Sequence, residues 1–146
     1  MPDRRAVQSA DEMRAFAAHL AQKLAGGQTL LLVGELGSGK TTFIQGLATA
    51  LGVRQPITSP SFAVVSEYET QHPTIRRLLH VDLYRLLGGA EDPAVAAVRE
   101  EIGRPELLVA IEWADRLGEN VPVGTLWLSF EHGAYENERI VTISGA

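Results

Sequence analysis

The sequence predicts an α/β fold, a three-layer sandwich of helices around central parallel strands with antiparallel hairpin additions. Three observations support this prediction. An almost wholly apolar strand at residues 29–33 leads into a glycine-rich segment, as expected of a central strand that is buried on both faces. A helical pattern follows that segment directly. A second buried strand at residues 107–111 runs into the acidic residue Glu112, and helical and strand patterns alternate along the chain.

Three amphipathic helices are expected, and each has recognisable end signals. Ser9 and Glu12 have the spacing of a capping box, and the helical repeat behind them continues until Gly26. The second helix is followed by a glycine in the C′ position. The third begins where Asp92 suits the N-cap and Pro93 the first helical position. The expected helical spans are residues 10–25, 40–51 and 92–102.

Two further pairs of strands are expected to be antiparallel. One pair is joined by a polar loop that contains a proline, and the other closes the chain around a polar segment with glycine and asparagine. Because side chains alternate along a strand, His80 and Asp82 are expected on the face opposite Val81. The expected pairs are residues 62–69 with 75–84, and residues 125–131 with 139–144.

Residues 34–41 read Gly-Glu-Leu-Gly-Ser-Gly-Lys-Thr and match the phosphate-binding pattern G-x-x-x-x-G-K-[ST] between a strand and a helix. Such a loop turns backbone amides around phosphate oxygens, while Lys40 would reach the β and γ phosphates and Thr41 would offer an oxygen to Mg²⁺. The alternative is a glycine-rich turn that only caps a helix. The sequence therefore predicts a nucleoside triphosphate site formed by the loop, namely Glu35, Leu36, Gly37, Ser38, Gly39, Lys40 and Thr41.

Hydrolysis also requires a carboxylate near Mg²⁺, and two acids at strand ends are candidates. Glu112 ends the second buried strand and is assigned to the metal, directly or through water. Asp82 ends a strand that His80 interrupts, and it is assigned to orienting or deprotonating the attacking water. The two roles could be exchanged. The alternative for either acid is a solvated or salt-bridged strand end, and for Trp113 a place in the core or pocket wall.

Composition narrows the class of protein. The chain has 146 residues, which suits a single domain over residues 1–146, and it has no cysteine for a disulfide or a thiolate metal site. Its net charge of −5 argues against strong autonomous binding to nucleic acid. No apolar stretch approaches the length needed to cross a bilayer, so we expect a cytoplasmic protein without a membrane partner.

A combination of segments resembles the bacterial TsaE (YjeE) family. The segments are the loop with Thr42 and Phe43, then Thr-Ser-Pro-Ser-Phe at residues 58–62, His-Val-Asp-Leu-Tyr-Arg at 80–85, and Ile-Glu-Trp at 111–113. The order and spacing span most of the chain, and the one departure is Ser61, where threonine is common. The resemblance implies ATP and Mg²⁺ as cofactors, with Lys40, Asp82 and Glu112 catalytic, Thr41 and Glu112 at the metal, and Thr42, Ser61 and Trp113 near the nucleotide.

The resemblance also implies a function. Such proteins are ATPases required, with the TsaB and TsaD proteins, for threonylcarbamoylation of tRNA adenosine-37, and they meet tRNA only indirectly through that complex. We expect slow hydrolysis by the chain alone, because no obvious arginine finger accompanies the loop. Two alternatives remain open: a small-molecule or nucleoside kinase, and a nucleotide-dependent scaffold without catalysis. A GTPase is disfavoured, since the chain has no N-K-x-D segment.

Overall fold

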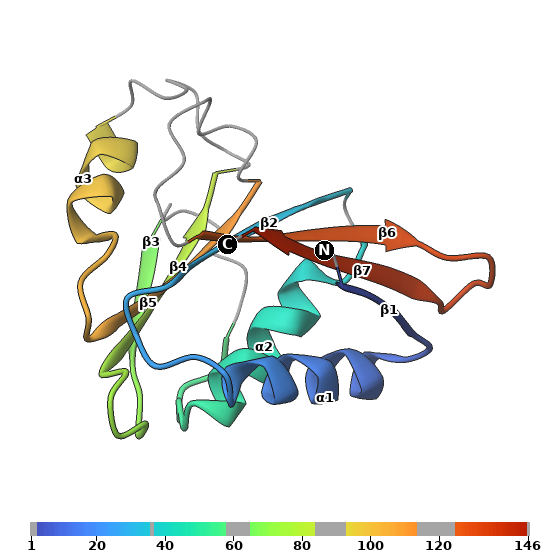
Figure 1. Ribbon diagram of the computed structural model, residues 1–146, viewed down its shortest axis with the longest axis horizontal. Helices are drawn as coiled ribbons and strands as arrows, with labels where there is room; N and C mark the ends of the chain where they lie inside the picture. The colour runs from blue at the N-terminus through green and yellow to red at the C-terminus, as the bar shows by residue number, and fades with distance from the viewer. Residues whose placement is uncertain (1–2, 36, 58–64, 84–92, 114–124, 146) are drawn as a thin grey trace.

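The computed structural model describes residues 3–35, 37–57, 65–83, 93–113 and 125–145. These residues form one seven-stranded sheet and three helices (Figure 1). The elements, in chain order, are β1 (Asp3–Val7), α1 (Ala10–Ala21), β2 (Thr29–Gly34), α2 (Lys40–Ala50), β3 (Val65–Glu69), β4 (Arg77–Asp82), α3 (Pro93–Glu101), β5 (Leu107–Glu112), β6 (Thr125–His132) and β7 (Arg139–Gly145).

The predicted sheet of central parallel strands with antiparallel additions is confirmed. The strand order is β1-β7-β6-β2-β5-β4-β3. The four inner strands β6, β2, β5 and β4 are parallel, whereas β3 pairs with β4, β7 with β6 and β1 with β7 in antiparallel fashion. Both predicted hairpins are therefore present, one on each side of the parallel strands. The phosphate loop follows β2, which lies between the parallel strands β5 and β6.

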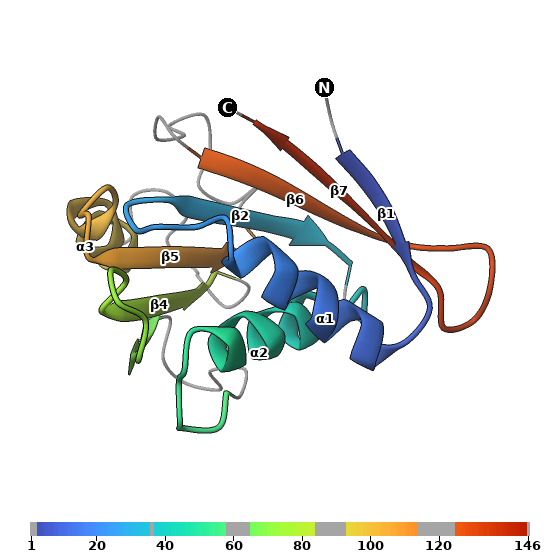
Figure 2. The same cartoon turned by 60° about the horizontal axis from the view of Figure 1, so that its bottom comes forward.

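The helices cover both faces of the sheet, so the three predicted layers are present. Helices α1 and α2 lie side by side against one face, and α3 lies against the other (Figure 2). Side chains of β2 point alternately to the two faces of the sheet and pack in both cores. Leu30 and Leu32 belong to the core under α1 and α2, and Leu31 belongs to the core under α3. All three leucines are fully buried. The sheet is thus fixed from both sides around the strand that carries the loop.

A glycine allows α1 and α2 to approach closely. A Cβ atom built on Gly46 of α2 would lie 2.6 Å from the Cα atom of Arg14 in α1. Phe16 of α1 and Phe130 of β6 each contact Phe43, with ring centroids 6.0 Å and 5.6 Å apart. Helix α2 is therefore held against both α1 and the sheet, and its first residue, Lys40, belongs to the phosphate loop.

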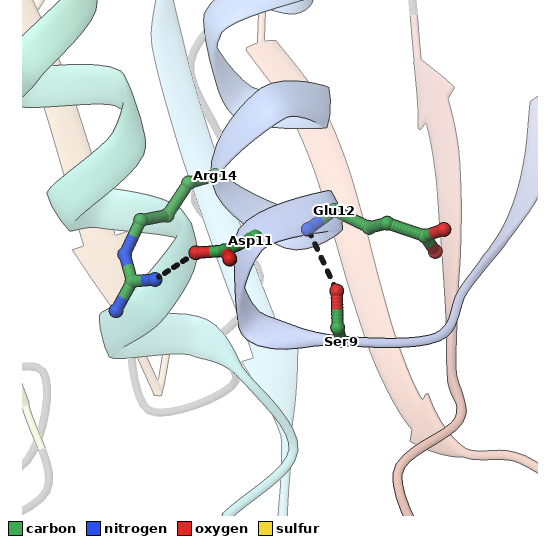
Figure 3. A network of polar contacts seen from close by, with 4 residues as sticks. All are labelled: Ser9, Asp11, Glu12 and Arg14. Atoms are coloured by element: carbon green, nitrogen blue, oxygen red, sulfur yellow. Dashed lines mark hydrogen bonds and ion pairs between the residues drawn. The ribbon is translucent and has the colours of Figure 1, made fainter.

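The start of α1 confirms the predicted N-cap in an altered form. The backbone N–H of Glu12 donates to the Ser9 hydroxyl at 3.1 Å, and Arg14 contacts Asp11 at 3.1 Å (Figure 3). The Glu12 carboxylate accepts from the backbone N–H of Gln8 at 2.5 Å, one residue earlier than a capping box requires. The Ser9 side chain therefore caps the helix as predicted, whereas the Glu12 side chain accepts from Gln8 in place of Ser9.

The structure differs from the predicted elements in three places. Strand β1 was not predicted, because only its last residue, Val7, is buried and the strand pairs through its backbone at the sheet edge. Helix α1 ends at Ala21 rather than near Gly26, and a tighter turn follows it, in which the backbone N–H groups of Lys23 and Leu24 donate to the carbonyls of Leu20 and Ala21. Strand β4 begins at Arg77, two residues later than predicted. Residues 62–64, Tyr84 and Asp92 lie outside the described ranges.

Candidate nucleotide-binding site

The loop that joins β2 to α2 turns tightly at its two ends. Gly34 has φ 152°, and a Cβ there would lie 2.5 Å from the carbonyl oxygen of Phe130 on β6. Gly39 is the N-cap of α2 and has a left-handed backbone with φ 106°. Both positions therefore favour glycine. The amides in the first turn of α2 have no acceptor within the helix, which makes the helix start a suitable anion site.

Lys40 is buried at the start of α2, with 5% of its surface exposed. Its ammonium group donates to the carbonyl oxygen of Gly34 and to that of Glu35, the latter at 3.0 Å. The same nitrogen lies 4.1 Å from the centroid of the Trp113 ring, within the range of a cation–π contact. The positive charge is thus compensated by backbone dipoles and one aromatic face. A phosphate group entering the loop would compete with these contacts for the ammonium.

Ser38 contributes a polar atom that has no partner within the described part of the chain. Its residue is 1% exposed, and its Oγ atom is buried without a hydrogen bond to any described group. A buried hydroxyl without a partner costs free energy, on the order of 1–3 kcal/mol. An oxyanion in the loop could accept from this hydroxyl, so the loop chemistry fits a phosphate ligand.

The two candidate carboxylates occupy neighbouring strand ends. Asp82 of β4 and Glu112 of β5 are register partners, and Glu112 is also the register partner of Leu32 in β2. Adjacent strands lie about 4.8 Å apart, so Glu112 is one strand from the loop-bearing strand and Asp82 is two strands away. Glu112 is 3% exposed. Both acids stand at the carboxyl end of the parallel strands, on the same edge as the loop.

His80 holds the carboxylate of Glu112. Its Nε2 atom lies 2.5 Å from Oε2 of Glu112, and the histidine is completely buried. The opposite face of β4 carries Leu79 and Val81, which pack in the core under α3, as the alternation predicted. The contact was not predicted, although a histidine that interrupts an apolar strand was a visible signal.

Trp113 follows Glu112 with an unusual backbone. Its φ is 59°, which makes it the one non-glycine residue with positive φ in the described part of the chain. For a bulky residue this conformation costs on the order of 1–3 kcal/mol. The ring packs partly against the core under α3 and provides the surface on which the Lys40 ammonium rests. The strained backbone therefore accompanies a contact with the loop lysine.

A pocket of about 400 Å³ lies between the loop, the start of α1 and the β6–β7 hairpin. Among the residues that line it are Ser9, Met13, Gly37, Thr42, Asn137 and Arg139. Arg139 at the start of β7 donates from Nε to the carbonyl oxygen of Gly37 at 3.1 Å, and from a terminal nitrogen to that of Glu136 at 3.0 Å. Nothing in the sequence pattern indicated that the hairpin contacts the loop.

The donors around the loop fit Mg²⁺. Thr41 in the first turn of α2 would supply a hydroxyl, and Glu112 on the adjacent strand β5 would supply carboxylate oxygens. In the described ranges, no group of three or more acidic, histidine or cysteine side chains could hold a metal without other ligands. Mg²⁺ usually combines one or two protein oxygens with substrate phosphates and water, so a sparse oxygen set is the expected form of the site.

Two predicted site residues, Leu36 and Ser61, lie outside the described ranges. The other predicted residues fall into two groups. The loop and first turn contain Glu35, Gly37, Ser38, Gly39, Lys40, Thr41 and Thr42, and the neighbouring strand ends contain Asp82, Glu112 and Trp113. The Lys40–Trp113 contact joins the two groups.

The fold is that of a P-loop NTPase. It is a three-layer sandwich in which a glycine-rich loop follows the central parallel strand and acids end the next two strands. The family model described as "Threonylcarbamoyl adenosine biosynthesis protein TsaE" matches residues 7–141. The chain belongs to the TsaE family, which takes part in the biosynthesis of threonylcarbamoyladenosine in tRNA.

Individual relatives agree with this assignment. A Streptomyces coelicolor protein named tRNA threonylcarbamoyladenosine biosynthesis protein TsaE is 32% identical over 139 residues, covering 91% of this chain and 90% of its own. A protein of the same name from Aquifex aeolicus is 38% identical over 112 residues, covering 75% of each chain. The crystal structure of Bacillus subtilis YdiB superposes with a TM-score of 0.76 at 29% identity, covering 99% of this chain and 86% of that one. Among the described residues, no helix is long and apolar enough to span a membrane.

Proposed function

We propose that the chain is a Mg²⁺-dependent ATPase that drives or resets the machinery for threonylcarbamoylation of tRNA adenosine-37. The observation that carries the proposal is the position of Glu112, one strand from the strand that leads into the Lys40 loop. A phosphate-binding ammonium and a carboxylate on adjacent strands are the parts that phosphoryl chemistry requires. A tRNA-modification role for the family supports the cytoplasm as the location.

Each residue has a distinct role in the proposed reaction. Loop amides and the Ser38 hydroxyl bind phosphate oxygens, and Lys40 leaves its backbone carbonyls to stabilise charge on the β and γ phosphates. Thr41 and Glu112 hold Mg²⁺, which supplies charge stabilisation to the transferring group when it is bound. Asp82, two strands from the loop, orients the attacking water and accepts its proton. The register supports this division of roles over the exchanged one.

The pocket beside the loop suits the nucleoside part of ATP. Gly37 and Thr42 line it, so a ligand with its phosphates in the loop has the pocket as its neighbour. The pocket volume of about 400 Å³ lies within the usual range for a small-molecule site. Asn137 and Arg139 would provide polar contacts from the hairpin. The family resemblance supports adenine as the base.

We expect the chain alone to hydrolyse ATP slowly and the TsaB and TsaD proteins to complete or gate the site, with tRNA reached only through that complex. The test is hydrolysis at saturating Mg-ATP with and without both partners. Turnover should rise when they are added, and Lys40→Ala should lower it by roughly 10²-fold or more. Equal turnover with and without the partners would refute the gating, and full activity of the Lys40 variant would refute the site.

A further inference from the structure

We propose that His80 is a positioning residue that fixes the Glu112 carboxylate for the cation beside the phosphate loop. The inference rests on the proposed function, because it assigns a purpose to a contact within that site. The contact is short, at 2.5 Å between Nε2 and Oε2, and both side chains are buried, with 0% and 5% of their surfaces exposed. It joins neighbouring strands β4 and β5 near the edge where Asp82 and Glu112 end them.

The sheet makes room for this contact. The register partner of His80 on β5 is Ala110, whose methyl group leaves space beside it for an imidazole ring. Glu112 is two residues further along β5 and therefore on the same face as Ala110. A diagonal neighbour on the adjacent strand is within reach of a long side chain such as histidine. The small residue at position 110 thus allows the ring to extend along the sheet towards the carboxylate.

The imidazole ring of His80 is oriented through Nε2, which contacts Glu112, and not through a hydrogen bond at Nδ1. Nδ1 of His80 is buried and has no hydrogen-bond partner in the described part of the chain. With Glu112 as a carboxylate, which only accepts, the His80 tautomer that donates to Oε2 carries its hydrogen on Nε2. If this fully buried position had only a packing role, an apolar aromatic residue would be more stable there than histidine, because an unpartnered buried nitrogen costs free energy. Its contact with the Glu112 carboxylate, the one hydrogen bond of its side chain among the described residues, explains the histidine.

Fixing this carboxylate matters because of its neighbours. Asp82 is the register partner of Glu112, so a second acid ends the adjacent strand. A bond from His80 to Oε2 limits the rotation of the carboxylate and presents the remaining oxygen in one orientation. Partners of this kind orient metal ligands, and their removal typically weakens metal affinity by about 10- to 100-fold.

The test measures cation affinity instead of turnover. Mn²⁺ binding is followed by electron paramagnetic resonance in the complex with a non-hydrolysable ATP analogue. His80→Phe keeps a ring but removes the donor, and His80→Asn is too short to reach Glu112. Both should weaken Mn²⁺ binding about 10- to 100-fold. His80→Gln places an amide N–H near the Nε2 position and should restore most of the affinity. His19→Gln, on the exposed side of α1, is the matched control and should change nothing.

Two comparisons decide between positioning and a general structural role. Affinity for the analogue without cation should be unchanged in the three His80 variants, and His80→Phe should have no further effect on Mn²⁺ binding in a Glu112→Gln background. Wild-type Mn²⁺ affinity in His80→Phe, equal losses in His80→Gln and His80→Asn, or a full further loss in the Glu112→Gln background would each overturn the inference. Failure of the wild-type chain to bind the analogue with Mn²⁺ would instead overturn the proposed function itself.

Discussion

The ammonium nitrogen of Lys40 rests 4.1 Å from the centroid of the Trp113 ring while it also donates to two loop carbonyls. Residues 40 and 113 belong to the start of α2 and the end of β5, so this contact connects the loop to the strand that carries Glu112. A ligand that draws Lys40 towards phosphates must change the surroundings of the indole. The ring is therefore a reporter built into the site.

Trp113 emission should change when Mg-ATP binds. In a Trp127→Phe variant, Trp113 is the single tryptophan, and titration with nucleotide should give a saturable change in its fluorescence. The physical cause is withdrawal of the cation from the ring face. The complementary Trp113→Phe variant, which retains Trp127 on β6, should show little change. A response carried by Trp127 alone would mean that Lys40 does not leave Trp113.

Glu112→Gln and Asp82→Asn should separate metal binding from water activation. Both changes should slow hydrolysis, with a loss of about 10²- to 10⁴-fold expected where a general base is removed. Only Glu112→Gln should raise the Mg²⁺ concentration needed for half-maximal activity, because Glu112 is the acid next to the loop-bearing strand. Magnesium titrations of both variants measure this, and the reverse pattern would exchange the two roles. Normal tRNA modification in cells despite loss of hydrolysis in Asp82→Asn would favour a scaffold.

Gly46→Ala should destabilise the fold although alanine is the better helix former. The new Cβ would lie 2.6 Å from a backbone atom of Arg14, which cannot move without shifting α1. Overpacking of this kind costs about 1–3 kcal/mol and outweighs a helix-propensity gain of about 1 kcal/mol. Urea denaturation measures the difference. Thr49→Ala at an exposed position of α2 serves as the control, and a more stable Gly46→Ala would show that the helices can separate freely.

Glu138 should titrate below its ordinary value. The side-chain amide of Gln8 donates to Oε2 at 2.8 Å and the backbone N–H of Ala134 to Oε1 at 2.8 Å, and these bonds lower the pKa of the carboxyl from 4.5. Since the folded pKa is depressed, the stabilisation is present above the unfolded pKa and disappears as the pH falls through the folded value. Carbon NMR of the carboxyl group measures the midpoint. Gln8→Ala should move it upward, and an unchanged midpoint would argue against the Gln8 contact.

Local sequence patterns predicted the parts of the fold that are encoded by neighbouring residues. The loop, the helix that follows it and the acid at the end of β5 each have a local physical cause, and the structure places them at one edge. The wrongly placed end of α1 shows the limit of this approach. Leu24 continues the apolar repeat and is buried, yet the backbone has already left the helix.

Contacts between distant segments could not be predicted. His80 reaches Glu112 across 32 residues, and Arg139 reaches Gly37 across 102, so both depend on the strand order. Strand β1 escaped prediction for a related reason: its exposed polar residues carry no apolar alternation, and its conformation is set by pairing with β7. Each of these features is determined by a partner that is distant in the sequence and adjacent in the fold.

The hydrogen bond from Arg139 to Gly37 gives the C-terminal hairpin a direct mechanical connection to the loop. Amino-acid changes in that hairpin would therefore shift the backbone of the loop, even though the hairpin carries no recognisable motif. A substitution at Arg139 would alter the support of the loop without touching any residue of the G-x-x-x-x-G-K-[ST] pattern.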